Sequence, residues 1–266
     1  MLSYRHGFHA GNFADLLKHI VLCQLLDYLK QKPAAIRYID THAGAGLYDL
    51  ADKKAQRTGE FHRGLGAVDL QTLPDSVNSY RALVTPFVDQ NRYPGSPLIA
   101  ARLLRPQDDL WLYELHNTDY PELKQLMSAD RRVRVFHEDG FNSLKALLPV
   151  KNARALILMD PSYELQSDYN RVVQALQEAC ARMPHAVCAV WYPCVDAQAT
   201  QYLLRHLKSL AGDKFWQYEL GSGSAEAAEG MQRCGMAVIN PPWNLAATAE
   251  PVLAGIEAQL AGAVKS

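Results

Sequence analysis

The sequence predicts an α/β protein with a doubly wound, mostly parallel sheet of seven strands, an antiparallel edge and a helical insertion. Short apolar runs alternate with helical patterns along the second half of the chain, which is typical of repeated βα units. The last two apolar runs follow each other with no helical pattern between them, so they predict an antiparallel pair at one edge. Four predicted strands end in polar groups, which indicates a binding site at the carboxyl edge of the sheet.

Length and charge narrow the classes of function. The 266 residues suffice for one large domain or a domain with an insertion, and the net charge of -1 excludes an overall attraction to polyanions. Contacts with nucleic acid must therefore come from local basic patches. No apolar run approaches the ~20 residues of a membrane span, and the first residues lack the apolar stretch of a signal peptide. We expect a cytoplasmic protein with no membrane partner.

The cysteines predict neither disulfides nor a bound metal. They are five in number, scattered along the chain, and contain no C-x-x-C pair. This pattern is typical of buried, reduced thiols.

The first predicted helix begins near Phe13. Asn12 can cap it and Asp15 lies in its first turn, where the helix dipole favours an acid. Lys18 and His19 follow on the same helix, close to its capped end. The preceding residues 4–9 interleave aromatic, cationic and imidazole groups, a mixture that can stack on bases and contact phosphates. An arm folded against its own domain would have a similar composition.

Residues 36–40 predict the first strand, followed by the turn Asp40-Thr41-His42-Ala43-Gly44-Ala45-Gly46. The spacing of Gly44 and Gly46 allows a tight turn and a close approach of a ligand to the backbone. The third glycine of a full dinucleotide-binding fingerprint is missing.

The alternation is interrupted over residues 47–105, where short helical patterns surround residues 65–70 and 80–87. We interpret this segment as an insertion over the carboxyl edge of a core formed by residues 1–46 and 106–266. It is a candidate substrate-binding element, and a structural cap is an equal alternative. Ser96 precedes Pro97 and an apolar pattern, so it predicts a helix N-cap that could also bind a carboxylate or a hydroxyl.

The alternation then resumes with six further strands, each predicted from an apolar run. They cover residues 110–114, 133–137, 156–160, 187–192, 215–220 and 236–240. Glu114 ends the first of them, and Asp139 follows the second. Residues 221–235, rich in small and polar types, predict a mobile loop between the last two strands.

The turn Asp160-Pro161-Ser162-Tyr163 ends a strand that reads as buried on both faces. Pro161 cannot extend the strand, so the turn presents a carboxylate, a free carbonyl and an aromatic ring at one point. Two acceptors beside an aromatic ring suit a planar group that carries an NH2, such as the edge of a base. An ordinary turn whose aspartate caps the next helix is the alternative.

A second such motif, Asn240-Pro241-Pro242-Trp243, follows the last predicted strand. If this strand is antiparallel, its end lies at the opposite edge of the sheet, so we assign the motif to fold stability.

Several strings of the sequence resemble those of the RlmJ-type 23S ribosomal RNA adenine-N6 methyltransferases, which are class I, Rossmann-like enzymes dependent on S-adenosylmethionine. The resemblance covers nearly the full chain. Besides the Asp160 turn, it rests on Tyr4-Arg5-His6, His9-Ala10-Gly11-Asn12, Leu17-Lys18-His19, Asp40-Thr41-His42-Ala43-Gly44-Ala45-Gly46, Tyr93-Pro94-Gly95-Ser96-Pro97, Glu114-Leu115-His116 and Asn240-Pro241-Pro242-Trp243.

The resemblance implies the roles of individual residues. It implies that Asp160 is catalytic and that Tyr4 lies near the substrate. The chemistry of the turn adds Pro161 and Tyr163 to the catalytic residues, and Arg5, Lys18 and Tyr163 are further candidates for contacts with the substrate. Lys53, Lys54 and Arg57 are further candidates for contacts with the RNA backbone. The cofactor S-adenosylmethionine would be bound by His19, His42, Gly44, Gly46, Ser96, Glu114, Asp139, Gly140 and Asp160. Within this set, Glu114 is assigned to the ribose, Asp139 to the adenine and the two histidines to the methionine end.

The motif departs from the family pattern at one position, where Ser162 replaces a second proline. The acceptors of Asp160 and Pro161 are kept, and only some rigidity of the turn is lost.

Three functions follow from these patterns. The first is N6 methylation of an adenine in 23S ribosomal RNA, by a monomer that acts before the ribosome is fully assembled. The second is methylation of DNA adenine or of protein glutamine, which the motif chemistry also permits. The third is a weakly catalytic protein that binds nucleic acid in the utilisation of external DNA.

Overall fold

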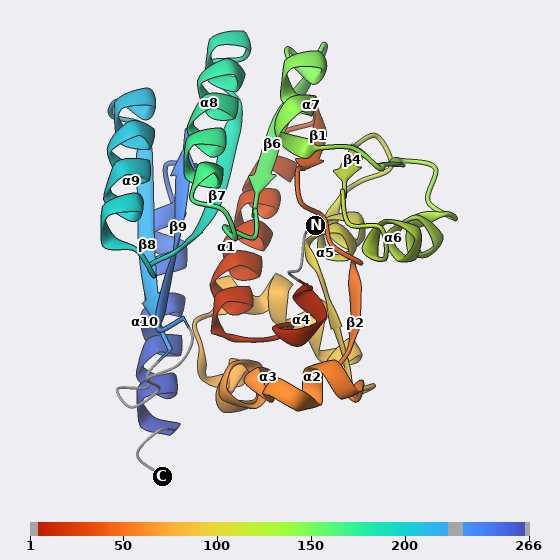
Figure 1. The fold of residues 1–266 in the computed structure, drawn as a ribbon, viewed down its shortest axis with the longest axis vertical. Helices are drawn as coiled ribbons and strands as arrows, with labels where there is room; N and C mark the ends of the chain where they lie inside the picture. The colour runs from red at the N-terminus through yellow and green to blue at the C-terminus, as the bar shows by residue number, and fades with distance from the viewer. Residues whose placement is uncertain (1–4, 223–230, 264–266) are drawn as a thin grey trace.

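A sheet of seven strands forms the centre of the computed structural model, which describes residues 5–222 and 231–263 (Figure 1). The order of the strands is β5-β4-β1-β6-β7-β9-β8. They are β1 (Ala35–Asp40), β4 (Asp109–Tyr113), β5 (Val133–Phe136), β6 (Ala153–Met159), β7 (Val187–Pro193), β8 (Phe215–Gly221) and β9 (Arg233–Ile239). Strands β5, β4, β1, β6 and β7 pair in parallel, whereas β9 is antiparallel to both β7 and β8. The seven predicted strands and the antiparallel edge are confirmed.

Helices cover both faces of the sheet. Helices α7, α8 and α9 pack on one face of the sheet, and α1, α5 and α10 pack on the other (Figure 1). The α-helices are α1 (Phe13–Lys30), α2 (Lys53–Thr58), α3 (Glu60–Arg63), α4 (Asn78–Val88), α5 (Ser96–Leu103), α6 (Asp119–Met127), α7 (Gly140–Leu147), α8 (Ser167–Arg182), α9 (Ala197–Ala211) and α10 (Leu245–Ala263). The short 3-10 helices are η1 (His6–Phe8), η2 (Leu65–Ala67), η3 (Leu70–Thr72) and η4 (Asp75–Val77). None of the helices in the described ranges is both long enough and apolar enough to cross a membrane.

Helix α1 is buried on nearly all sides. The side chain of Asn12 caps it by accepting the N–H of Asp15 at 3.0 Å, as the sequence predicted. The helix packs against α4, α5 and α10 and against β8 and β9. A helix that is apolar around most of its circumference is stable only in such an enclosed position. Its polar residues are therefore held in a fixed environment near the sheet.

Residues 47–105 contain α2 to α5, the short 3-10 helices η2 to η4, and a second sheet that the sequence did not reveal. In this sheet β2 (Leu47–Asp49) pairs antiparallel with β3 (Arg92–Pro94). Each strand has only three residues, too few to show an alternating pattern. The boundaries of the insertion stay a prediction.

The prediction that Ser96 caps α5 was wrong. Gly95 occupies the N-cap position, and Ser96 is the first residue of the helix. The Ser96 hydroxyl donates a hydrogen bond of 2.7 Å to Oδ2 of Asp40, a fully buried carboxylate at the end of β1. A buried carboxylate requires such donors. The Ser96 hydroxyl therefore binds Asp40 and does not cap the backbone of its own helix.

The Asn240 motif lies at the edge of the sheet opposite to Asp160, as predicted. Nδ2 of Asn240 donates to the carbonyls of Pro184 at 2.9 Å and Ala186 at 2.8 Å, just before β7 begins. Asp160 instead follows the carboxyl end of the parallel strand β6. The expected loop 221–235 is partly strand, because β8 extends to Gly221 and β9 begins at Arg233; residues 223–230 lie outside the described residues.

Candidate active site

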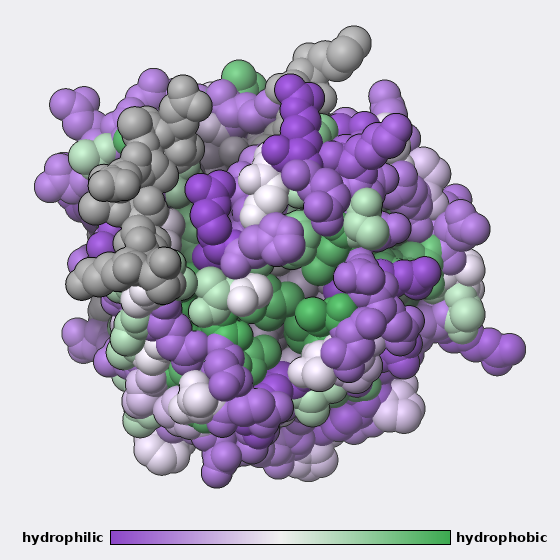
Figure 2. Space-filling model, turned by 90° about the horizontal axis from the view of Figure 1, so that it is seen from below, coloured by the Kyte–Doolittle hydropathy of each residue, from purple (hydrophilic) through white to green (hydrophobic). Residues whose placement is uncertain are grey.

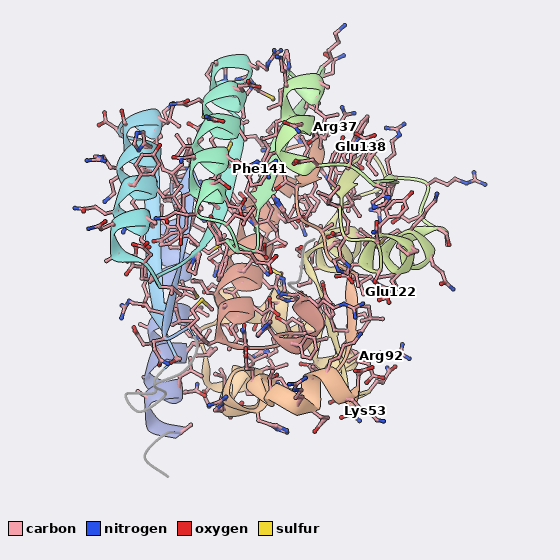
Figure 3. All side chains as sticks on the ribbon, viewed as in Figure 1. Arg37, Lys53, Arg92, Glu122, Glu138 and Phe141 are labelled. Carbon is pink, nitrogen blue, oxygen red and sulfur yellow. The ribbon has the colours of Figure 1, made fainter. Side chains whose placement is uncertain are left out.

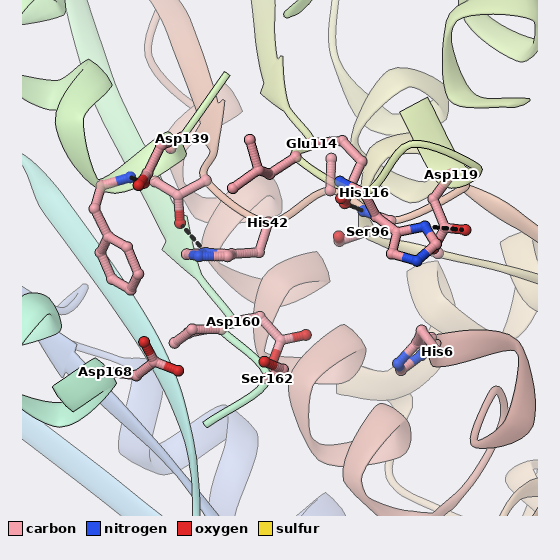
Figure 4. Close-up of a pocket in the computed structure, with 18 of the residues that line it drawn as sticks. His6, His42, Ser96, Glu114, His116, Asp119, Asp139, Asp160, Ser162 and Asp168 are labelled. Carbon is pink, nitrogen blue, oxygen red and sulfur yellow. Dashed lines mark hydrogen bonds and ion pairs between the residues drawn. The ribbon is translucent and has the colours of Figure 1, made fainter. Parts of the chain in front are cut away.

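Two cavities meet at the turn that follows β6. The inner cleft lies over the carboxyl ends of β1, β4 and β6 (Figure 4). It brings together most of the predicted site: Lys18, His19, His42, Gly44, Ser96, Glu114, Asp139, Gly140, Asp160 and Pro161. The outer cavity, of about 760 Å³, extends from the same turn towards α3 and α10. Both cavities are lined by His6, Lys18, Asp160 and Ser162.

Glu114 ties the loop after β1 to the end of β4. Its Oε2 accepts the N–H of Gly44 at 2.7 Å, and its Oε1 accepts the N–H of His116 at 2.6 Å. Burial raises the pKa of Glu114 above its usual value, and these hydrogen bonds only partly offset that effect. Gly44 has a φ of +63°, and a Cβ at this position would lie 2.3 Å from the Tyr48 hydroxyl. The cleft is therefore narrow here and is lined by backbone.

Asp139 and His42 form the opposite side of the inner cleft. Oδ1 of Asp139 caps α7 by accepting the N–H of Phe141 at 3.0 Å, and its Oδ2 pairs with Arg171. The Nδ1 atom of His42 lies 2.8 Å from Oγ1 of Thr41, and its ring meets the Phe141 ring edge-on at 4.6 Å. Burial lowers the pKa of His42 to about 4, so this side chain is neutral at physiological pH.

Asp40 supports the cleft from below. The hydroxyls of Tyr38 and Ser96 each donate to its Oδ2 at 2.7 Å. Burial raises the pKa of Asp40 to about 6 despite these donors. The interaction holds Ser96 at the wall of the cleft.

His19 links α1 to the inserted segment. Its Nδ1 lies 2.7 Å from the Tyr93 hydroxyl, which lies 3.2 Å from the hydroxyl of Tyr80. Its Nε2 is buried and has no hydrogen-bond partner among the described residues. Burial lowers the pKa of His19 to about 3.

Replacing His19 with glutamine should make the fold less sensitive to acid. Since the pKa of His19 is lowered from 6.5 to about 3, the folded protein keeps it neutral across this range, whereas the unfolded chain takes up a proton. The free energy of unfolding therefore decreases as the pH is lowered. His19 contributes up to about 1.4 kcal/mol to this decrease for each pH unit. Glutamine cannot take up that proton. Urea denaturation between pH 7 and 4 measures the slope, and the exposed His185→Gln serves as control. Equal slopes for the wild type and His19→Gln would contradict the prediction.

Asp160 is anchored from α1. Its Oδ2 accepts a hydrogen bond of 2.5 Å from Nζ of Lys18, which also lies 2.9 Å from Oδ1 of Asp15. Oδ2 of Asp15 accepts from the N–H of Gly11 and lies 2.9 Å from Nε2 of His6. The Oδ1 atom of Asp160 accepts no hydrogen bond from any residue in the described ranges. One oxygen of Asp160 is thus held, and the other is available.

Replacing Lys18 with methionine should destabilise the protein by about 3 kcal/mol, because it leaves the buried carboxylate of Asp15 and the half-buried one of Asp160 without their shared cation. The methyl transfer that the family resemblance implies should fall at least about tenfold, since Asp160 loses its anchor. Thermal unfolding and initial rates measure the two effects. The control is Lys30→Met, which breaks the more exposed pair with Asp27 on the same helix. A Lys18→Met protein with wild-type stability and rate would contradict the expectation.

Tyr163 lines the outer cavity and not the inner cleft. Its φ is +51°, an uncommon conformation for a residue with a side chain. Its hydroxyl donates to the carbonyl of Trp191 at 2.8 Å, and its ring lies 4.6 Å from that of Tyr169. The turn therefore directs the aromatic ring away from the cleft side of Asp160.

Some predicted site residues lie elsewhere. Gly46 lines neither cavity; it has a φ of +79°, and its carbonyl accepts the N–H of Gly95 at 2.9 Å. Arg5 also lines neither cavity, and Tyr4 lies outside the described residues. Lys53, Lys54 and Arg57 belong to α2, and Lys53 lies far from Phe141 of the inner cleft (Figure 3).

The sequence did not single out several residues that complete the site. Asp15 and Arg171 hold Lys18 and Asp139, Tyr93 holds His19, and Trp191 lines the outer cavity. The spacing of Asp15 and Lys18, three residues apart on one helix, is the one local signal that could have revealed a pair. The other partners are distant in sequence.

The chain matches a family model described as "Ribosomal RNA large subunit methyltransferase D, RlmJ" over residues 33–265. It is 44% identical over 264 residues to ribosomal RNA large subunit methyltransferase J of Escherichia coli (strain K12), covering 98% of this chain and 94% of the relative. It is 43% identical over 258 residues to the protein of the same name from Haemophilus influenzae, covering 95% and 92%.

A solved structure with a similar fold is that of protein LPL1258 from Legionella pneumophila. The two chains superpose with a TM-score of 0.88 at 37% sequence identity, over 95% of this chain and 94% of that one. The similarity therefore extends over nearly the whole chain.

Proposed function

The chain belongs to the RlmJ family of ribosomal RNA large subunit methyltransferases, and from this premise we propose that it methylates the N6 amine of an adenine in 23S ribosomal RNA with S-adenosylmethionine. The observation that carries the proposal is the position of Asp160. It stands between a narrow cleft and a wide cavity, with one carboxylate oxygen anchored by Lys18 and the other available.

The inner cleft fits the cofactor. Backbone forms its wall at Gly44 and Gly140, where a Cβ would lie 2.3 Å from the Tyr48 hydroxyl and 2.0 Å from the Thr41 carbonyl oxygen. Glu114 would hold the ribose, because each of its oxygens retains a lone pair beyond the backbone N–H that it accepts. The buried Nε2 of His19, which lacks a partner in the described part of the chain, would gain one from the methionine end.

The residues of the turn would prepare the adenine amine. S-adenosylmethionine supplies an electrophilic methyl group when it is bound. The lone pair of an adenine amine is delocalised into the ring, so the amine is a poor nucleophile. Asp160 and the carbonyl of Pro161, each accepting one N–H, would draw the nitrogen towards a tetrahedral geometry and stabilise the positive charge that develops on it. Lys18 keeps the Asp160 side chain in position for this step.

The outer cavity would admit the base. Tyr163 lies in its wall beside Asp160, so a base whose amine reaches Asp160 can pack against this ring. The inserted segment 47–105 contributes Glu60, His62, Arg63 and Ala67 to the opposite wall. This contribution supports its assignment as a substrate-binding element.

Methyl incorporation from labelled S-adenosylmethionine tests the proposal. Purified protein is incubated in parallel with transcribed 23S ribosomal RNA, with adenine-containing duplex DNA and with a glutamine-containing protein. We expect N6-methyladenine in the RNA alone, and mapping by nuclease digestion and mass spectrometry identifies the nucleotide. Incorporation into DNA or protein in place of RNA would overturn the proposal.

We further propose that the protein acts in the cytoplasm, as a monomer, on RNA that is not yet enclosed in the finished ribosome. The depth of Asp160 supports the preference for accessible RNA, because its side chain is only 16% exposed and a base must leave its helix to reach it. Comparing free 23S RNA with purified large subunits tests the preference, and sedimentation tests the monomer.

A further inference from the structure

The outer cavity is larger than its proposed target requires. Its volume of about 760 Å³ lies in the upper part of the range of about 300 to 1,000 Å³ that holds whole drug-sized ligands. A single adenine is smaller than such ligands, and it must lie at the end of the cavity next to Asp160. Most of the cavity, between α3 and the wall formed by β7 and α10, is therefore left for something else.

One wall of this remaining space is apolar, and it is exposed mainly at its edge. Trp191 and Pro193 of β7 and Leu260 of α10 line it, and Val195 stands at its edge with 73% of its surface exposed. Gln166 and Asp196 also line the cavity beside Val195, and Nε2 of Gln166 donates to Oδ2 of Asp196 at 3.4 Å. Viewed from below, the molecule shows a hollow with a hydrophobic floor and a hydrophilic rim (Figure 2).

The opposite wall, on α3, carries the guanidinium of Arg63 beside the imidazole of His62. His62 and Arg63 are exposed there, and Arg63 forms no ion pair within the described ranges. Two acids of the cavity, Glu60 and Asp196, are already engaged. Glu60 accepts hydrogen bonds from Asn12 and lies 2.8 Å from Nδ1 of His9, and these contacts lower its pKa although burial alone would raise it. Asp196 accepts the N–H groups of Gln198 and Ala199 at the start of α9.

We propose that this space is a second nucleotide subsite, which holds the residue next to the target adenosine in an unpaired strand. Its base would pack on the wall of Trp191, Pro193 and Val195, and its phosphate would lie against His62 and Arg63. The pairing of an apolar wall with a cationic one matches a nucleotide, which has an apolar base face and an anionic backbone. The subsite is continuous with the catalytic turn, because Ser162 and Asp160 line the same cavity. The inference rests on the proposed RNA methyltransferase function.

Short oligoribonucleotides that carry the mapped adenosine test the subsite. Three are compared: the natural sequence, and two with an abasic residue on either side of the adenosine. With the wild-type protein, one of the two abasic substitutions should raise KM about tenfold, because a stacked base is lost. In Val195→Asp, KM for the natural sequence should rise by a similar factor, and the abasic substitution should add little to it.

Arg63→Ala tests the phosphate contact. We expect KM to rise about tenfold with kcat unchanged, and the dependence of log KM on log salt to become shallower by about 0.7, the contribution of one phosphate on a single strand. The matched controls are Arg182→Ala, an exposed arginine that likewise ends a helix, and Trp243→Asp, an exposed hydrophobic residue at the opposite edge. Both should stay within about twofold of the wild type.

Equal KM values for all three oligonucleotides, or an unchanged salt dependence in Arg63→Ala, would overturn the subsite while leaving the methyltransferase function intact. Failure of the wild-type protein to methylate any RNA would overturn both.

Discussion

Replacing Asp160 with alanine should lower the rate of methyl transfer about 1,000-fold while the protein stays folded. The substitution removes the carboxylate that would accept an N–H of the adenine amine and stabilise the charge on nitrogen. The fold should persist because Lys18 keeps its ion pair with Asp15 at 2.9 Å. The measurements are initial rates with labelled S-adenosylmethionine and 23S RNA, together with thermal unfolding and cofactor affinity.

Glu164→Ala is the matched control for this prediction, since it removes an exposed acid from the same turn. Its rate should stay within a few-fold of the wild type. Asp160→Asn adds a second comparison, because it keeps the shape of the side chain but replaces one acceptor with a donor. If Asp160→Ala formed product at the wild-type rate, the proposed chemistry would have to be abandoned.

Replacing Gly140 with alanine should weaken cofactor binding about 100-fold and lower the free energy of unfolding by about 2 kcal/mol. A Cβ at Gly140 would lie 2.0 Å from the carbonyl oxygen of Thr41 and 2.6 Å from its Cα. Thr41 cannot move aside, because its N–H and its hydroxyl both donate to the carbonyl of Leu158 at 3.1 Å. The start of α7 must therefore shift, and Asp139 and Phe141 would move with it.

Isothermal titration with S-adenosylmethionine and urea denaturation measure the two effects. Gly262→Ala, near the end of α10, is the control, because within the described residues the added Cβ would meet no atom within 4 Å beyond its chain neighbours and the backbone of its own helix. Its affinity should be unchanged and its stability equal or slightly higher, since alanine favours a helix. Wild-type affinity in Gly140→Ala would show that α7 and the loop after β1 do not limit the cleft.

The strands and their polar ends could be predicted from the sequence because both are local features. Each apolar run stops at Asp40, Glu114 or Asp160, and the parallel sheet brings these ends to one edge. The opposite position of Asn240 could be predicted for the same reason, from the direction of a single strand.

Contacts between distant segments could not be predicted. Lys18 and Asp160 are 142 residues apart in the sequence, so Lys18 was expected to contact substrate and its ion pair with Asp160 was not foreseen. The sequence around Ser96 is typical of a helix N-cap, but its hydroxyl donates a hydrogen bond to the buried carboxylate of Asp40. The walls of the outer cavity come from α3, β7 and α10, three elements that share no sequence pattern.

The position of α1 has a consequence for when the protein becomes active during its synthesis. The helix that carries Lys18 emerges from the ribosome well before β8, β9 and α10, which enclose much of its apolar surface. A nascent chain therefore holds α1 with much of that surface uncovered, and the anchor of Asp160 is not yet fixed. We expect a nascent polypeptide to be inert towards RNA until β8, β9 and α10 have left the ribosome and packed on α1.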